Sequence, residues 1–254
     1  MLKSIDINCD MGESFGNWNM GNDAGMMPRI TTANVACGFH ASDPVTMLKT
    51  VELAKEHSVE VGSHPGLPDL LGFGRRTMNI TPEDAHAYVL YQTGALQAAL
   101  QVHGMRLHHI KPHGAFYSVL RTDEALAEAV ADAISSFPDT PMLYWPAPTS
   151  AAMPVAAKKA GIRVVGEIYP ELQYAPDGTL VIQRTKHETD TEFAAAQVKR
   201  YVQSGEVEAI DGSTIALDAE SLCIHGDGPN STDVGDAVRA ALEEIGCEIA
   251  PVTA

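Results

Sequence analysis

The chain has 254 residues, and its 33 acidic and 17 basic side chains give a formal net charge of −16. Such an acidic chain repels phosphate backbones, which argues against nucleic-acid binding. Hydrophobic residues make up 45% of the chain, and no apolar run approaches the roughly 18 residues of a membrane span. The first ten residues lack the apolar core of a signal peptide, so we expect a cytoplasmic protein.

Short apolar runs and helical patterns alternate along the chain. The runs typical of buried parallel strands are Ser4–Cys9, Thr32–Cys37, Val59–Ser63, Leu107–Lys111, Met142–Trp145, Ile162–Gly166 and Ser221–His225. The predicted helices are Pro44–His57, Pro82–His103, Thr122–Phe137, Thr149–Ala160, Asp190–Gln203 and Ser231–Ile245. Helix-capping residues followed by proline mark the starts of the first two helices.

This alternation favours an α/β fold, a seven-stranded (β/α) TIM-like barrel formed as a single domain by residues 1–254. A doubly wound open sheet is the alternative. The segment 167–189 is the least regular, and Asp177-Gly178 within it indicates a turn followed by a short strand. We expect this segment to form an excursion over the barrel mouth.

Polar residues follow most of the predicted strands at their carboxyl ends, where active sites of parallel barrels are built. These residues include Asp10, His40, His64, Lys111, His113, Glu167, His225 and Asp227. Asp6, Asn8 and Asp10 alternate with apolar neighbours, so all three point to one side of the first strand. Burying carboxylates there is costly unless they meet cations, metals or hydrogen-bond donors.

Individual residues leave more than one interpretation open. Lys111 and His113 point to the same side of the fourth predicted strand. Lys111 is suited either to stabilising a negative charge that develops on the substrate or to forming a structural ion pair with Asp10 or Glu167. Asp227 lies between two glycines, as either a turn residue or a substrate ligand. The four cysteines, Cys9, Cys37, Cys223 and Cys247, form no CxxC pair and are expected to be buried hydrophobic residues, with Cys37 the one in a polar motif.

Metal and nucleotide sites receive little support from motifs. The candidate metal ligands are Asp6, Asp10, His40 and His64, with His113 and Asp227 as further residues of suitable type, but no tight motif such as HExxH joins them. A divalent metal is therefore conceivable but not indicated. The chain contains no GxxxxGK[ST] motif, so ATP binding by this chain alone has little support.

The same motifs resemble those of the LamB/YcsF family, whose characterised bacterial members are the A subunits of the ATP-dependent 5-oxoprolinase. The matching stretches are IDINCDMGESFG (5–16), ITTANVACGFHASDP (30–44), VGSHPGLPDLLGFGRR (61–76), YQTGALQAAL (91–100), HIKPHGAFY (109–117) and CIHGDG (223–228). The resemblance implies a barrel of the glycoside hydrolase/deacetylase type and the ATP-dependent opening of 5-oxo-L-proline to L-glutamate. It also implies two partner subunits, B and C, that are related to allophanate hydrolase.

Carried over by motif, this resemblance marks the polar residues at the strand ends as site residues, and we add Arg184 as the displaced family arginine and assign the residues to two sets. The expected catalytic residues are Asp10, His64, Lys111, His113, Glu167 and Asp227. The expected substrate-binding residues are Asp6, Asn8, Glu13, Asn34, His40, Arg184 and His225. In the corresponding mechanism, Lys111 and Arg184 balance negative charge, while Asp10 or Asp227 activates water with His64 or His113. Glu167 protonates the leaving nitrogen.

The sequence departs from the family pattern after the sixth strand. Where the family has an Asp-Arg pair, this chain has Glu171-Leu172, and the later family arginine corresponds to Arg184, displaced by one position. Leucine cannot bind a carboxylate or phosphate as arginine does. The alternatives are therefore a different lactam or cyclic amide as substrate, or a metal-dependent deacetylase or amidohydrolase that works without ATP. A non-catalytic binding protein is a further alternative.

Overall fold

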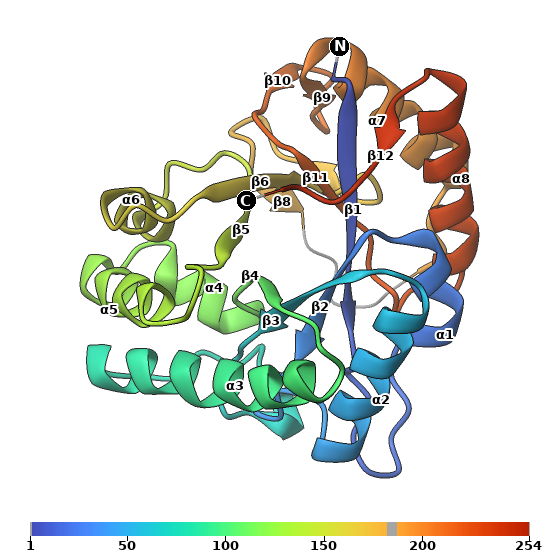
Figure 1. Ribbon diagram of the computed structural model, residues 1–254. Coiled ribbons are helices and arrows are strands. Elements are labelled where there is room, and N and C mark those ends of the chain that lie inside the picture. Colours follow the sequence, from blue (N-terminus) through green and yellow to red (C-terminus); the bar gives the residue numbers. More distant parts are fainter. Residues whose placement is uncertain (1, 182–186, 254) are drawn as a thin grey trace.

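Seven parallel strands close into a barrel in the computed structural model, which describes residues 2–181 and 187–253 (Figure 1). The barrel strands are β1 (Ser4–Met11), β2 (Thr32–Ala36), β3 (Glu60–His64), β4 (Leu107–Ile110), β5 (Met142–Pro146), β6 (Val164–Ile168) and β11 (Ser221–Cys223). Parallel pairing of β11 with β1 closes the barrel, with Asn8 opposite Cys223. This closure confirms the predicted barrel and excludes the open sheet.

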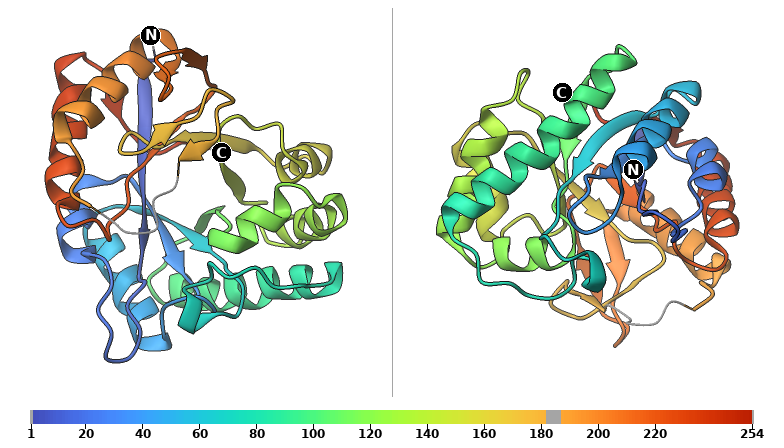
Figure 2. Two further views of the ribbon diagram at one scale, coloured as in Figure 1. Left: turned by 180° about the vertical axis from the view of Figure 1, so that it is seen from behind. Right: turned by 90° about the horizontal axis from the view of Figure 1, so that it is seen from below.

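The helices surround the barrel, as the view from below shows (Figure 2). They are α1 (Asp23–Met26), α2 (Pro44–Glu56), α3 (Pro82–Val102), α4 (Gly114–Leu120), α5 (Glu124–Ser135), α6 (Ala152–Lys159), α7 (Thr191–Ser204) and α8 (Ser231–Glu244). Short 3-10 turns occur at Met27–Arg29 and Leu70–Gly72. None of the helices in the described ranges is long and apolar enough to cross a membrane.

Two predicted helix starts have the expected caps. The Asp43 carboxylate accepts hydrogen bonds from the backbone of Val45 and Thr46, and Pro44 occupies the first turn. Thr81 and Asp84 form a reciprocal capping box at the start of α3. These local contacts fix where α2 and α3 begin.

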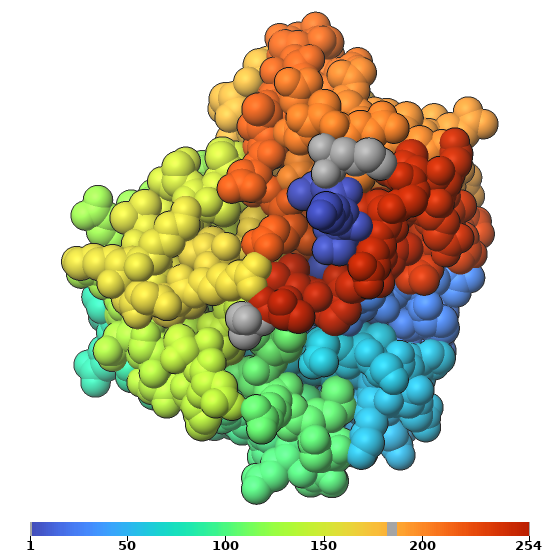
Figure 3. Space-filling view, turned by 45° about the horizontal axis from the view of Figure 1, so that its top comes forward, coloured from blue at the N-terminus to red at the C-terminus, as the bar shows by residue number. Residues whose placement is uncertain are grey.

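Four short strands, together with α1 and α4, were not predicted. Strand β12 (Glu248–Ile249) pairs with the amino-terminal half of β1, so a segment near the C-terminus lies beside the first strand, red next to blue in Figure 3. Strands β9 (Glu206–Glu208) and β10 (Thr214–Ala216) form a hairpin. These strands have two or three residues, too few for a periodic pattern to emerge.

The irregular segment after β6 contains a small antiparallel pair. Strand β7 (Gln173–Tyr174) pairs with β8 (Leu180–Val181), which follows the Asp177-Gly178 turn as the sequence predicts. The Asp177 carboxylate accepts a hydrogen bond from the Thr179 backbone N–H, and Gly178 adopts a φ of 84°. The turn chemistry of these residues therefore places β8 against β7.

The apolar core lies mainly between the barrel and its helices, whereas the barrel interior contains a column of polar side chains. At its base, Asp6 accepts hydrogen bonds from Thr32 and Ser221. Above it, Asn8 donates to Glu167 and accepts from Asn34. The column ends at the carboxyl ends of the strands, because the period of two along β1 places Asp6, Asn8 and Asp10 in successive layers on one side.

Candidate active site

A cavity of about 700 Å³ opens at the carboxyl ends of the barrel strands. The polar side chains that line it are Asp10, Glu13, Arg75, Thr77, Lys111, His64, His113, Tyr169, Glu171, His187, His225 and Asp227, among others. Apolar contacts come from residues such as Phe73, Leu172, Leu180 and Phe193. Leu172 and Leu180 belong to the segment 167–189 that was expected to cover the barrel mouth, so the described part of this segment contributes to the cavity wall.

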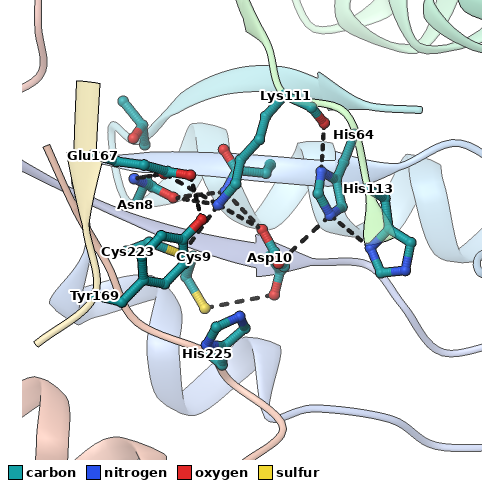
Figure 4. Close-up of polar contacts among 12 residues, drawn as sticks. Asn8, Cys9, Asp10, His64, Lys111, His113, Glu167, Tyr169, Cys223 and His225 are labelled. Carbon is teal, nitrogen blue, oxygen red and sulfur yellow. Dashed lines mark hydrogen bonds and ion pairs between the residues drawn. The ribbon is translucent and has the colours of Figure 1, made fainter. Parts of the chain in front are cut away.

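The ammonium group of Lys111 is the centre of a buried polar cluster (Figure 4). Its Nζ lies 3.3 Å from Asp10 Oδ1 and 3.2 Å from Glu167 Oε2. It also donates to Asn8 Oδ1 at 3.2 Å and to Cys223 Sγ at 3.0 Å. Lys111 is 5% exposed, so its charge is balanced by these neighbours rather than by water.

The electrostatics of this cluster favour the charged forms of Lys111 and Asp10. Burial alone would lower the pKa of Lys111, but the carboxylates of Asp10 and Glu167 raise that pKa well above its usual range. Burial alone would raise the pKa of Asp10, but His64 and Lys111 hold it well below its usual range. Lys111 is therefore a fixed cation and cannot serve as a base at neutral pH.

Glu167 lies behind the cavity wall and is 1% exposed. The Tyr169 hydroxyl donates to Glu167 Oε1 at 2.5 Å, and Asn8 Nδ2 donates to Glu167 Oε2 at 2.9 Å. Burial raises the pKa of Tyr169 well above its usual range, so its side chain stays a phenol. Tyr169 lines the cavity whereas Glu167 does not, so Glu167 acts on the cavity only through Tyr169 or Lys111.

A second cluster contains Glu13, His40, His64 and His113, whose candidate ligand atoms all lie within 4.8 Å of one another. His64 Nε2 lies 2.9 Å from His113 Nδ1 and 3.5 Å from Asp10 Oδ2. His40 stacks on His113 with ring centroids 3.8 Å apart. Burial lowers the pKa of His40 well below its usual range, so this ring is neutral.

Of the four expected metal ligands, the two histidines belong to this cluster and the two aspartates, Asp6 and Asp10, do not. His40 and His64 belong to the cluster that could hold a metal ion, together with Glu13 and His113. Asp6 does not, because it lies at the base of the barrel, 0% exposed, with Thr32 and Ser221 as its partners. The four residues come from separate segments of the chain, which explains why no tight sequence motif indicated them.

The other predicted site residues have different positions. His225 and Asp227 line the cavity, and the His225 side chain contacts the Glu171 carboxylate. Asn8, Asn34 and His40 are buried behind the wall, where Asn34 donates to Asp10 Oδ1 at 2.8 Å. These buried side chains support the lining residues. Arg184 lies outside the described residues.

Some residues of the site were not among the predicted ones. Tyr169 and Cys223 contact the Lys111 cluster, and Arg75 lines the cavity. Cys223 was expected to be only a buried hydrophobic residue, and no local motif signals its contact with Lys111. Glu171 was noted as a departure from the family pattern, and its position beside His225 gives that departure a structural role. Cys37, by contrast, bonds to the Val35 carbonyl away from the cavity.

The chain is similar along nearly its whole length to known proteins. It is 47% identical over 248 residues to the A subunit of 5-oxoprolinase from Thermus thermophilus, covering 96% of this chain and 98% of that protein. It is 45% identical to the A subunit of 5-oxoprolinase from Thermococcus onnurineus, covering 98% of this chain and 97% of that one.

Among solved structures, the lactam utilization protein of Thermus thermophilus superimposes with a TM-score of 0.90 at 45% identity. The match covers 98% of this chain and all of that one. The sequence profile of the LamB/YcsF family matches residues 5–254. The chain therefore belongs to the LamB/YcsF family.

Proposed function

We propose that this chain is the A subunit of a cytoplasmic 5-oxoprolinase, which opens 5-oxo-L-proline to L-glutamate with ATP. The observation that carries the proposal is the end-to-end similarity to the A subunits of 5-oxoprolinases, at up to 47% identity. A cavity with a fixed cation, carboxylates and imidazoles at the carboxyl ends of the strands supports a hydrolytic reaction at that place.

The proposed reaction begins with activation of the amide, because an unstrained lactam is a poor electrophile. Transfer of the terminal phosphoryl group of ATP to the amide oxygen yields ADP and activates the ring carbon. Water adds to that carbon, and the C–N bond breaks as the nitrogen takes a proton. A second water molecule then releases phosphate from the resulting acyl phosphate and leaves glutamate.

Lys111 is proposed to stabilise the negative charge that develops on the amide oxygen. Its ammonium group is fixed in a buried setting by Asp10, Glu167 and Asn8, so little reorganisation is needed during the reaction. Its raised pKa keeps it charged throughout. Preorganised charges of this kind contribute about 3–4 kcal/mol to transition-state stabilisation in other hydrolases.

The carboxylates of the cavity are proposed to handle water. Asp10 is ionised, and its low pKa makes it a weak base, so we assign it the orientation of the attacking water. Asp227 also lines the cavity and is assigned the acceptance of the water proton. Glu167 does not line the cavity, and its carboxylate accepts hydrogen bonds from Tyr169 and Asn8, so the leaving nitrogen is proposed to take the proton that Asp227 accepts from the attacking water.

Recognition of the substrate carboxylate is assigned to Arg75. Among the described residues that line the cavity, Arg75 is the arginine, and its guanidinium lies over the Phe73 ring at 5.1 Å. An arginine can bind a carboxylate through two parallel hydrogen bonds. Binding and use of ATP are assigned to the assembly of this chain with partner subunits B and C.

The test is glutamate formation from 5-oxoproline and ATP, measured for the chain alone and then with subunits B and C. We expect activity only in the complete mixture and in the presence of ATP. The corresponding Thermus thermophilus protein is the positive control for the partners, and the Lys111→Met variant is the matched negative control. Inactivity of this chain with partners that work with the Thermus protein would refute the proposal.

A different lactam is the second candidate, and a specific observation favours it. Leu172 lines the cavity at a position where the family resemblance implies arginine. Without that cation, the site binds a substrate carboxylate less strongly and accommodates a more apolar ring. Comparing 5-oxoproline with 2-pyrrolidinone and other cyclic amides in the complete mixture distinguishes the two substrates, because a carboxylate-free lactam is preferred only in the second case.

A further inference from the structure

His40 is a buried side chain whose polar atoms are left without partners. The residue is 1% exposed, and neither ring nitrogen has a hydrogen-bond partner among the described residues. Its Nε2 lies 3.7 Å from Glu13 Oε1, beyond hydrogen-bonding distance. A buried polar group without a partner is costly, so its retention calls for an explanation such as an ion.

The two neighbouring rings are each held by a backbone carbonyl at one nitrogen and turn the other nitrogen toward each other. His64 Nδ1 lies 2.6 Å from the Lys111 carbonyl oxygen, and His113 Nε2 lies 2.8 Å from the Phe73 carbonyl oxygen. A carbonyl oxygen only accepts, so both of these nitrogens carry the proton. The other nitrogens, His64 Nε2 and His113 Nδ1, lie 2.9 Å apart on the side of the cluster that faces Glu13 and Asp10.

His64 and His113 follow the pattern of metal-ligating histidines in proteins, whereas His40 has no such partner among the described residues. Such histidines almost always donate the other ring N–H to a carbonyl or carboxylate, which fixes the tautomer and directs the lone pair at the ion. Tetrahedral ligands about 2.0–2.1 Å from zinc lie about 3.3 Å apart. The ligand-atom separations of 2.9, 3.7 and 4.0 Å in the cluster lie on both sides of that value.

The surrounding backbone holds the rings in place. A Cβ atom added to Gly66 would lie 2.4 Å from His40 Nδ1, and one added to Gly74 would lie 2.6 Å from His40 Cβ. Glycine at these positions therefore allows the chain to approach the ring closely. Glu13, His64 and His113 line the cavity, which gives an ion a route of entry.

We propose that Glu13, His40, His64 and His113 form a binding site for one divalent transition-metal ion of the zinc type. Imidazole nitrogens and a carboxylate are suitable ligands for zinc, and also for cobalt as its spectroscopic substitute. The ion would lie on the cavity wall next to Asp10, whose Oδ2 is 3.5 Å from His64 Nε2. This site goes beyond the proposed lactam hydrolysis and does not depend on it.

The experiment measures metal binding by the full chain alone, without a histidine tag. Protein stripped with a chelator is titrated with Zn²⁺, and the Co²⁺-loaded protein is examined for visible absorption. We expect one ion per chain, an intense tetrahedral Co²⁺ spectrum, and a rise in Tm of about 5–10 °C at about a hundredfold excess over Kd.

Two variants and one control locate the ion. His40→Gln and Glu13→Gln should each weaken Zn²⁺ binding by at least about tenfold, as loss of a supporting contact already does. His225→Gln removes a cavity histidine outside the cluster and should leave binding unchanged. If His40→Gln does not fold, Glu13→Gln and the wild-type Co²⁺ spectrum still provide the test.

Binding below one ion per chain, or affinity unaffected by Glu13→Gln, would overturn the proposal. So would a nitrogen NMR spectrum of the zinc-treated protein that shows a proton shared between His64 and His113. Because the readout is metal content and spectra, failure of this proposal leaves the lactam assay untouched. Inactivity in that assay likewise says nothing about metal binding.

Discussion

The two sides of the cavity, built around Lys111 and around His40, satisfy their polar groups in different ways. Around Lys111, the side chains form hydrogen bonds with one another. Asn8, for example, donates to Glu167 and Ser221, and it accepts from Asn34 and Lys111. Around His40, both ring nitrogens lack partners within the described ranges. A network whose hydrogen bonds are all made holds its charged groups in fixed positions, and we call it the closed network. A cluster of ligand atoms without partners, which we call the open cluster, is suited to binding an ion.

The largest effect is expected for Lys111→Met, which breaks the closed network. Asp10 and Glu167 would then face each other without their shared cation, so we expect a loss of about 3–5 kcal/mol in the free energy of unfolding. Turnover in the complete 5-oxoprolinase mixture should fall about a hundredfold to a thousandfold. Urea unfolding and the glutamate assay measure the two effects.

A double variant separates stability from catalysis on the Lys111 side. Lys111→Met combined with Glu167→Gln removes one of the two uncompensated charges and should recover part of the lost stability without recovering activity. Recovery of activity in the double variant would show that the Lys111 charge is not needed for turnover.

On the His40 side, Gly66→Ala tests how tightly the ring is held. The added Cβ would lie 2.4 Å from His40 Nδ1, so the ring must shift. We expect this shift to lower the free energy of unfolding by about 1–3 kcal/mol and to weaken Zn²⁺ binding. Gly94→Ala, within α3, is the control. A Cβ added there would meet no atom within 4 Å beyond its chain neighbours and its own helix backbone, so this variant should stabilise the protein by about 0.5–1 kcal/mol. Equal effects of the two variants would contradict the close approach.

His40→Leu tests the open cluster in the metal-free protein. Because the ring nitrogens have no partners to lose among the described residues, an apolar replacement should raise the free energy of unfolding by about 1 kcal/mol in chelator. With Zn²⁺ present, the same variant should lose the stabilisation that the metal gives the wild type. A large destabilisation in chelator would indicate that the ring already has its partners without metal.

Arg75→Gln, at the outer part of the cavity, is expected to change substrate binding alone and to leave the free energy of unfolding nearly unchanged. If Arg75 binds the substrate carboxylate, KM for 5-oxoproline should rise about tenfold, equivalent to about 1.4 kcal/mol, with kcat nearly unchanged. Arg76→Gln is the matched control, because the Arg76 side chain turns away and contacts Asp69. An equal rise in KM for both variants would point to a general effect of charge.

The sequence determined the alternation of elements and the end of the barrel at which polar residues gather. Apolar runs and helical periodicity are local properties, so the seven barrel strands and the starts of α2 and α3 could be predicted within a few residues. The alternation in β1 likewise placed Asp6, Asn8 and Asp10 on one side. It did not show that Asp6 lies at the base of the barrel, away from the cavity.

The tertiary structure decided which of these side chains meet. Closure of β11 onto β1 brings Cys223 opposite Asn8 and beside Lys111, although more than a hundred residues separate it from Lys111. The rings of His40, His64 and His113 come together because the loops after β2 and β4 and the end of β3 meet at one barrel mouth. Such contacts depend on strand order, register and loop path, and these arise from long-range packing rather than from any local pattern.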